Sequence, residues 1–240
     1  KTIQKRIVRM GMKMHKLFRH IVHSIPNECS MDYMDKRSYI VGIDEAGRGP
    51  VAGPVAVGIF VIRNNAVLRP RSKKLKLKDS KKLSERQRNE WWSEINEWKK
   101  LGKVDFCVMQ GSAREIDDKG IAVVIRELIS KGLGELDVPY TSALYLDGSL
   151  RAPKEFSKQK TIIKGDEKIR VISLASICAK VVRDQYMTSL SKKYPKYHFW
   201  KHKGYGTKEH LESILKYGIS KEHRKTFLKG VFHTKIDKAK

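Results

Sequence analysis

Paired acids beside a glycine-rich stretch are the first candidates for chemistry in this sequence. Asp44 and Glu45 end an apolar run, and three glycines and an arginine follow within nine residues, in VGIDEAGRGPVAGPV. Two more apolar runs lead into an acid, LYLDG at Asp147 and KTIIKGD at Asp166. Because the ends of neighbouring strands meet at one edge of an open sheet, we expect these carboxylates to lie close together.

A cluster of four carboxylates would be suited to binding divalent metal ions. Like charges repel, so such a cluster needs a cation, and a purely oxygen ligand set favours Mg²⁺ or Mn²⁺ over zinc. Two ions about 3.5–4 Å apart can bind the attacking and leaving oxygens of a phosphodiester. The alternative for each single acid is a turn or a helix cap, and Asp147-Gly148 is a common turn pair. Three repeats of the same strand-then-acid pattern favour the metal site.

The glycine loop offers backbone groups that can approach a ligand closely. Gly47 and Gly49 lack a β-carbon, which leaves their amides and carbonyls accessible, and Arg48 between them can donate two hydrogen bonds to a phosphate. Glycine turns are common, so this pattern is weakly specific by itself. The loop is not a nucleotide-binding P-loop, because G-x-x-x-x-G-K-[ST] occurs nowhere in the sequence.

The charge balance indicates a polyanionic partner. The 240 residues include 51 Lys and Arg against 26 Asp and Glu, a formal net charge of +25. Nucleic acid is the expected partner, and lysines that merely face solvent are the alternative. The run RSKKLKLKDSKK, residues 71–82, is either a phosphate-binding track or a solvated loop.

Other features argue against several classes of protein. The three cysteines have neither a disulfide-framework nor a metal-type spacing, which fits a reducing compartment, and Cys178 is expected in the core. No apolar run approaches 18 residues, so we expect no membrane span. His198 and His202 have the i, i+4 spacing of zinc ligands but lack a third partner, so zinc is not expected.

Strands that alternate with helices are expected to position the acids. Apolar runs predict strands within 39–43, 56–62, 103–110, 142–148 and 160–166. Helical patterns cover 83–100, with a Ser84/Gln87 capping box and a core face of Trp91, Ile95 and Trp98; 112–132, from a Ser112/Glu115 box to Gly132; and 171–193. An opening hairpin followed by alternating elements predicts a mixed α/β sheet flanked by helices.

The two ends of the chain have their own composition. In residues 1–38 apolar residues recur every three or four positions, and no acid precedes Glu28. This fits a targeting peptide, a membrane-surface helix, a basic nucleic-acid arm, or an extension upstream of a start at Met31 or Met34. From Lys221 onward the basic tail either aids duplex binding or is disordered.

Aromatic and basic residues are mixed in YPKYHFWKHKGYG, which could form a duplex-facing surface. Within it, Phe199 and Trp200 are expected in the core rather than at that surface.

Six motifs, in this order, resemble the bacterial type of ribonuclease HII, the type 2 ribonuclease H family. They are GIDEAGRGPVAGPV, KDSKKLS, LYLDG, KGDEK, ASICAKVVRDQYM and HKGYGTKEH, from about Tyr39 to the region of Phe227. The resemblance implies a ribonuclease H-like catalytic domain at 39–194 and a helical C-terminal part at 195–240, with 1–38 outside the family pattern. It also implies metal-dependent cleavage of RNA in RNA–DNA hybrids. Single ribonucleotides in duplex DNA would be incised on their 5′ side, leaving 3′-hydroxyl and 5′-phosphate ends.

The resemblance assigns roles to individual residues. Its metal-binding and catalytic acids fall on Asp44, Glu45, Asp147 and Asp166, with two Mg²⁺ or Mn²⁺ ions expected beside the substrate. Its substrate contacts fall on Gly47, Arg48 and Gly49 at the ribose 2′-hydroxyl, on Tyr205 at the next sugar, and on Lys81 at a phosphate. Asp184 is a rival for the fourth acid, with an ion pair to Arg183 or Lys180 as its alternative role. The strand-end pattern favours Asp166.

Two other functions stay open at this point. A non-catalytic basic nucleic-acid-binding protein could keep the fold, although the four acids argue against it. A ribonuclease H that cuts only hybrids is the second, and the Gly-Arg-Gly loop with Tyr205 argues against that. The protein is expected to be a cytoplasmic monomer, or an organellar one if 1–38 is a transit peptide. A sliding-clamp partner is left open.

Overall fold

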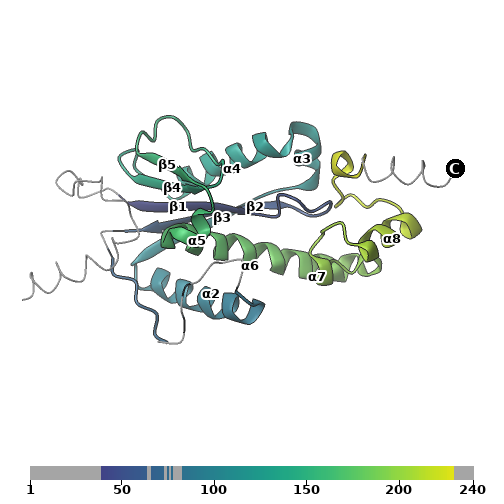
Figure 1. The fold of residues 1–240 in the computed structure, drawn as a ribbon, viewed down its shortest axis with the longest axis horizontal. Helices are drawn as coiled ribbons and strands as arrows, with labels where there is room; N and C mark the ends of the chain where they lie inside the picture. Colours follow the sequence, from purple (N-terminus) through teal and green to yellow (C-terminus); the bar gives the residue numbers. More distant parts are fainter. Residues whose placement is uncertain (1–38, 64–65, 73–74, 76, 78–82, 230–240) are drawn as a thin grey trace, which may run out of the picture.

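A five-stranded mixed sheet forms the centre of the molecule (Figure 1). The computed structural model describes residues 39–63, 66–72, 75, 77 and 83–229. The strands, in the spatial order β3-β2-β1-β4-β5, are β1 (Ile40–Ala46), β2 (Val55–Ile62), β3 (Val104–Gly111), β4 (Ala143–Asp147) and β5 (Gln159–Ile162). The first three are antiparallel neighbours, and β4 and β5 extend the sheet in parallel from β1. This arrangement confirms the predicted mixed α/β sheet.

Helices cover both faces of the sheet (Figure 1). One face packs against α4 (Ile121–Glu135), which follows α3 (Ala113–Lys119), and the other against α2 (Glu85–Lys100) and α6 (Arg170–Lys193). Because side chains alternate along a strand, Val57 and Ile59 of β2 join the α4 side of the core, and Phe60 joins the α6 side. The sheet is therefore buried on both faces.

Two glycines let α6 lie directly on the sheet. A β-carbon on Gly42 of β1 would come within 2.1 Å of the carbonyl oxygen of Val171, and one on Gly58 of β2 within 2.3 Å of that of Ala175. Val171 and Ala175 are one helical turn apart. The backbone of α6 therefore rests on two adjacent strands at positions where any side chain would hold it away.

Several local predictions are confirmed. Ser84 with Gln87 and Ser112 with Glu115 form reciprocal capping boxes at the starts of α2 and α3. The predicted apolar face of α2 is buried, as is Cys178 on α6. Among the described residues, no helix is long and apolar enough to span a membrane.

Other local predictions were wrong. The single helix expected over 112–132 is two helices, because Gly120 takes a φ of +81° and ends α3. Gly132 does not end α4, which continues to Glu135; a β-carbon there would lie 2.6 Å from Ile59, so Gly132 serves close packing instead. Trp200 is 57% exposed rather than in the core, whereas Phe199 is fully buried.

The C-terminal part packs against the end of the sheet beside the glycine loop. It contains the 3-10 helix η3 (Pro195–Tyr197), α7 (Phe199–His202) and α8 (Lys208–Tyr217). A separate apolar cluster joins it to α6 and to Val51 and Ala52 in the loop after β1. The division into parts at 39–194 and 195–240 stays a prediction, and residues 1–38 lie outside the described residues.

Candidate functional site

A cavity of about 350 Å³ lies where β1 and β4 end. Its lining comes from distant parts of the chain: Asp44, Glu45, Ala46, Gly47, Arg48, Gly49, Arg88, Asp147, Ser176, Lys180 and Tyr205. Three of the four predicted acids and the whole Gly-Arg-Gly stretch share this cavity with Tyr205. Lys81 lies outside the described residues.

The parallel pairing of β1 with β4 brings Asp44 and Asp147 together. Ile43 is paired with Leu146 in the register, so the residue that follows each one ends up at the same edge of the sheet. Asp44, Glu45 and Asp147 thus lie at one edge of the sheet, each as part of its strand. The strand-end pattern was wrong for Asp166, because β5 ends at Ile162 and Asp166 lies in a short helix after it.

Asp44 is buried on the face of β1 that meets α6. It is 2% exposed and lies opposite Gly58 in the antiparallel register. Ser176 of α6 hydrogen-bonds its carboxylate, a contact that depends on the close approach of α6 over Gly58. Burial raises the pKa of Asp44 well above its usual range, against the Ser176 hydrogen bond, and the charges of Asp147 and Glu45 raise it further.

Glu45 is held by the arginine of the glycine loop. Arg48 Nη1 donates to Glu45 Oε1 at 3.1 Å. Burial raises the pKa of Glu45, the Arg48 contact opposes that rise, and the charge of Asp147 adds to it. This i, i+3 contact places the Arg48 side chain beside the carboxylates that line the cavity.

Asp147 and Asp166 are linked through the turn that follows β5. The amide of Gly165 donates to Asp147 Oδ1 at 2.6 Å. The next residue, Asp166, lies in the short helix α5 (Gly165–Lys168), is fully buried, and accepts a hydrogen bond at its backbone oxygen from Ser173 of α6 at 2.5 Å. Asp166 therefore lies next to the cavity but is not part of its lining.

The donor chemistry of the cavity fits a hard divalent cation. Its acidic wall offers carboxylate oxygens only, the ligands that Mg²⁺ and Mn²⁺ prefer, and a cation there would offset the charges that raise the pKa of Asp44. Among the described residues, however, no three His, Cys, Asp or Glu side chains are gathered closely enough to hold a metal ion. Repulsion between the carboxylates opposes such an approach.

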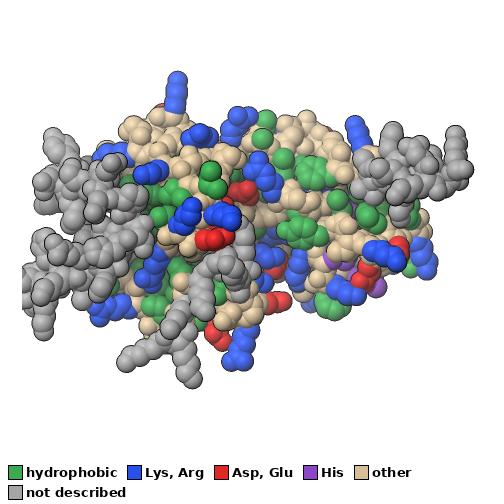
Figure 2. All heavy atoms as spheres, viewed as in Figure 1, with side chains coloured by type: hydrophobic (Ala, Val, Ile, Leu, Met, Phe, Trp, Pro, Cys, Tyr) green, Lys and Arg blue, Asp and Glu red, His purple; other side chains and the backbone are tan. Residues whose placement is uncertain are grey.

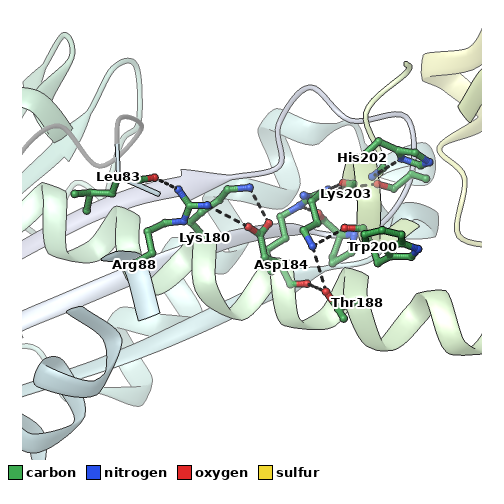
Figure 3. A network of polar contacts seen from close by, with 12 residues as sticks. Leu83, Arg88, Lys180, Asp184, Thr188, Trp200, His202 and Lys203 are labelled. Carbon is green, nitrogen blue, oxygen red and sulfur yellow. Dashed lines mark hydrogen bonds and ion pairs between the residues drawn. The ribbon is translucent and has the colours of Figure 1, made fainter. Parts of the chain in front are cut away.

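Asp184 is not in this cavity. It lies on α6, where Lys180 Nζ contacts its Oδ1 at 2.7 Å and Arg88 Nη2 its Oδ2 at 4.0 Å (Figure 3). Asp184 lines a neighbouring groove between α2 and α6, and Arg88 lines both. Asp184 therefore forms the predicted ion pair with Lys180, whereas Arg183 donates to backbone carbonyl oxygens.

Two buried arginines support the glycine loop from behind. Arg183 of α6 donates to the carbonyl oxygens of Pro54 at 2.9 Å and Lys203 at 3.0 Å. Arg224 donates to those of Gly47, Arg48 and Gly53. Gly47 itself has a φ of +86°, and a β-carbon there would lie 1.9 Å from Arg183 Nε, so only glycine fits. Sequence reasoning missed the role of both arginines.

Three buried histidines lie beneath Tyr205, and their hydrogen bonds fix each ring as neutral. His210 donates Nδ1–H to the Tyr205 carbonyl at 2.8 Å, and its Nε2 faces His223 Nε2 at 3.1 Å. Because Ser220 N donates to His223 Nδ1 at 3.0 Å, His223 donates to His210. His202 donates Nε2–H to the carbonyl oxygen of Tyr197, and its ring stacks on that of His210 with the ring centroids 4.2 Å apart. His202 is thus not a zinc ligand here.

We expect the contribution of the buried histidines to stability to fall as the pH drops from about 6.5 towards about 4. Burial lowers the pKa of His210 and of His223 to about 4, from an ordinary 6.5. In that window the unfolded chain takes up protons that the folded chain refuses, so their stabilising contribution is complete above 6.5 and is lost progressively below it. Urea unfolding followed by tryptophan fluorescence at a series of pH values measures the loss.

The matched variants for this prediction are His223→Gln and His198→Gln. His223→Gln should reduce the slope of the unfolding free energy against pH in this window, by an amount that corresponds to up to about one proton taken up on unfolding. His198 is exposed and paired with Glu209, so His198→Gln should not reduce that slope. An acid-induced change of the same size in His223→Gln and in the wild type would contradict neutral, buried histidines.

Basic side chains surround the acidic group. Figure 2 shows Lys and Arg side chains spread over one face of the molecule, with small groups of acidic side chains among them. Arg88 and Lys180 bring positive charge into the cavity itself. The basic side chains can bind a polyanion although carboxylates line the same cavity.

The chain is similar to a well-defined family of nucleases. Residues 41–235 match the family model described as Ribonuclease HII. Ribonuclease HII of Prochlorococcus marinus (strain MIT 9312) is 43% identical over 190 residues, covering 78% of this chain and 88% of that protein. Ribonuclease HII of Ruminiclostridium cellulolyticum is 38% identical over 192 residues, covering 80% and 71%.

Solved structures have the same fold. The RNase HII of Archaeoglobus fulgidus, solved as a complex with PCNA, aligns with a TM-score of 0.59 at 26% identity, covering 78% of this chain and 93% of that one. Bst-RNase HIII, solved in complex with Mn²⁺, aligns with a TM-score of 0.55 at 15% identity over 87% and 74%, which shows the fold alone.

Proposed function

The chain belongs to the ribonuclease HII family, and we propose that its cavity at the ends of β1 and β4 is where it cuts nucleic acid. The enzyme is a hydrolytic endoribonuclease acting on RNA–DNA hybrids and on ribonucleotides embedded in duplex DNA. The products we propose are 3′-hydroxyl and 5′-phosphate ends, from incision on the 5′ side of the ribonucleotide.

One observation carries the assignment of the site. Asp44, Glu45 and Asp147 line the same cavity as the Gly47–Gly49 loop and Tyr205. A ribonucleotide-specific phosphodiesterase needs a metal-binding group and a group that recognises the 2′-hydroxyl, which separates RNA from DNA. The carboxylates can serve as the first and the backbone of the loop as the second.

The side chains of the cavity have distinct proposed roles. The backbone of Gly47, Arg48 and Gly49 approaches the ribose 2′-hydroxyl and the adjacent phosphate. Tyr205, which is 46% exposed, offers its ring to the sugar that follows the ribonucleotide. A β-carbon on Gly49 would lie 4.0 Å from the Tyr205 ring, so loop and ring adjoin.

Basic side chains of the cavity are proposed to bind the phosphates of the substrate backbone. Arg48, Arg88 and Lys180 all line it, and each can neutralise a phosphate. The contact of Arg48 with Glu45 and of Lys180 with Asp184 holds both cations in defined positions before the duplex arrives. Lys81 is a further proposed phosphate contact, outside the described residues.

The acids are proposed to hold the metal. Two Mg²⁺ or Mn²⁺ ions bound by Asp44, Glu45, Asp147 and Asp166 would activate water for in-line attack and stabilise the departing 3′-oxygen. Asp166 would join from the turn that positions Asp147 through Gly165. The chain itself supplies the orientation: Ser176 fixes Asp44, and the Gly165 amide fixes Asp147.

We expect cleavage to depend on both the ribonucleotide and the metal. The purified protein is incubated with a duplex holding one ribonucleotide, with a full RNA–DNA hybrid and with an all-DNA duplex, in Mg²⁺, in Mn²⁺ or in EDTA. The first two substrates should be cut in either metal, and the all-DNA duplex should not. EDTA should abolish cleavage while duplex binding persists, because basic side chains supply most of the affinity.

The rival functions give different results in the same experiment. A non-catalytic binding protein on this fold would show salt-sensitive binding with no product in either metal. An enzyme restricted to hybrids would cut the full hybrid and spare the single ribonucleotide. Cleavage that continues in EDTA would overturn the metal assignment.

A further inference from the structure

Residues 220–224, which we call the anchor segment, lie directly behind the glycine loop. This stretch follows α8 and pairs with the chain just beyond the loop. Gly53 N donates to the carbonyl oxygen of Glu222 at 2.8 Å, and Arg224 N donates to that of Val51 at 2.8 Å. The anchor segment thus contacts the loop from the side opposite the cavity.

Arg224 connects the anchor segment to the loop. It is fully buried, and its guanidinium donates to three carbonyl oxygens: to Gly53 at 3.0 Å, Arg48 at 3.1 Å and Gly47 at 2.7 Å. Burial, together with the nearby charge of Arg183, lowers the pKa of Arg224 to about 9, so the group stays protonated at neutral pH. Each of the three guanidinium nitrogens serves one acceptor, and the single ammonium nitrogen of a lysine cannot match this fixed planar spread.

These contacts fix the direction of two amides. In a trans peptide the carbonyl of one residue and the amide of the next point in opposite directions, and no peptide bond among the described residues is cis. Because the carbonyls of Gly47 and Arg48 point at Arg224, the amides of Arg48 and Gly49 point away from it. Arg224 is not part of the cavity lining, whereas Arg48 and Gly49 are.

The anchor segment also holds Tyr205, which lines the same cavity beside the loop. Ser220 N donates to His223, His223 donates to His210, and His210 donates to the carbonyl of Tyr205. This chain of hydrogen bonds connects Tyr205 to the residue next to Arg224. The loop and the tyrosine therefore share one support.

We propose that Arg224 is a positioning residue for ribonucleotide recognition, because it aims the amides of Arg48 and Gly49 at the substrate. The anchor segment thereby sets the distance between the glycine loop and Tyr205. This inference rests on the proposed function, since it names what positions the groups assigned to the 2′-hydroxyl and the adjoining sugar.

The test measures the preference for a ribonucleotide in binding. Arg224→Lys keeps the charge but not the three-carbonyl fork. Fluorescence anisotropy gives the affinities for a duplex with one ribonucleotide and for the same duplex in DNA, with Asp147→Asn in every protein to prevent cutting. Arg224→Lys should lower the ratio of the two affinities at least about tenfold, since small misplacements of reacting or binding groups are costly. The all-DNA affinity should stay within about twofold, because the charge is kept.

A second pair of variants avoids any buried substitution. Asp117 of α3 accepts from Lys225 N at 2.8 Å and from Thr226 N at 2.9 Å, so it secures the chain just after Arg224. Asp118, its neighbour, is exposed and pairs only with Arg114 among the contacts recorded for the described residues. Asp117→Ala should lower the preference roughly threefold, the scale of one weak hydrogen bond, and the charge-matched Asp118→Ala should leave it unchanged.

The affinity ratio separates positioning from mere folding. A partly unfolded variant would lose binding-competent molecules for both duplexes equally, and the ratio would be that of the wild type. An unchanged ratio in both Arg224→Lys and Asp117→Ala overturns the inference. A parent protein that shows no preference also overturns the inference, whereas an unmutated chain that cuts no ribonucleotide duplex overturns the proposed function.

Discussion

Replacing Asp147 by Asn is expected to abolish cleavage of a single-ribonucleotide duplex while leaving the fold and duplex binding nearly unchanged. The amide oxygen of Asn can still accept the Gly165 amide, which Asp147 Oδ1 now does at 2.6 Å. The negative charge is lost, and with it a ligand for the metal ions. We expect kcat to fall by roughly 10²–10³-fold or more, as for loss of one preorganised charge-stabilising group.

The control for this prediction is Asp118→Asn, the same chemical change on an exposed side chain of α3. It should cut at the wild-type rate. Single-turnover cleavage and anisotropy with the same labelled duplex separate chemistry from binding. Near wild-type nicking by Asp147→Asn would remove Asp147 from the reaction and, with it, the site proposed at the ends of β1 and β4.

Replacing Gly58 by Ala is expected to destabilise the protein by about 3 kcal/mol, the upper range for overpacking a core. The new methyl group would lie 2.3 Å from the carbonyl oxygen of Ala175, a backbone atom that no rotamer change can move. Helix α6 would have to lift from β2. Ser176 and Lys180 would move with it, so activity should fall along with the free energy of unfolding.

The control for the packing prediction is Gly134→Ala. Gly134 lies in α4, and a β-carbon there would meet nothing within 4 Å. Alanine should therefore stabilise the protein by about 0.5–1 kcal/mol through helix propensity. Urea unfolding followed by tryptophan fluorescence measures both changes, since Trp91 and Trp98 are buried on α2. Equal effects from the two substitutions would contradict the packing of α6 on Gly58.

Local patterns predicted most of the secondary structure because they depend on nearby residues only. The capping boxes and the apolar runs of β1, β2 and β3 are of this kind. The errors at Gly120 and Gly132 have one cause: a glycine can provide a positive φ or a close contact, and the sequence does not distinguish them. The general rule that aromatic side chains are buried predicted a core position for both Phe199 and Trp200, but only Phe199 is buried.

The candidate site was predictable where side chains meet at strand ends and unpredictable where they bond to backbone. Asp44 and Asp147 follow from the apolar runs that lead into them. Arg183 and Arg224 leave no such signal, because a buried arginine that binds carbonyl oxygens needs no acidic partner in the sequence. The link between Arg224 and Gly47 spans 177 positions, so only the folded chain reveals it.

The contact between Arg224 and Gly47 also bears on the order in which the protein matures on the ribosome. The loop is made before the arginine that supports it, because synthesis runs from the N-terminus. The sheet has all five strands by Ile162, yet the loop gains its final shape only once residue 224 has emerged. We expect nuclease competence only after residue 224 has been made, because a nascent chain stalled before that residue would carry the acids without a fully shaped loop beside them.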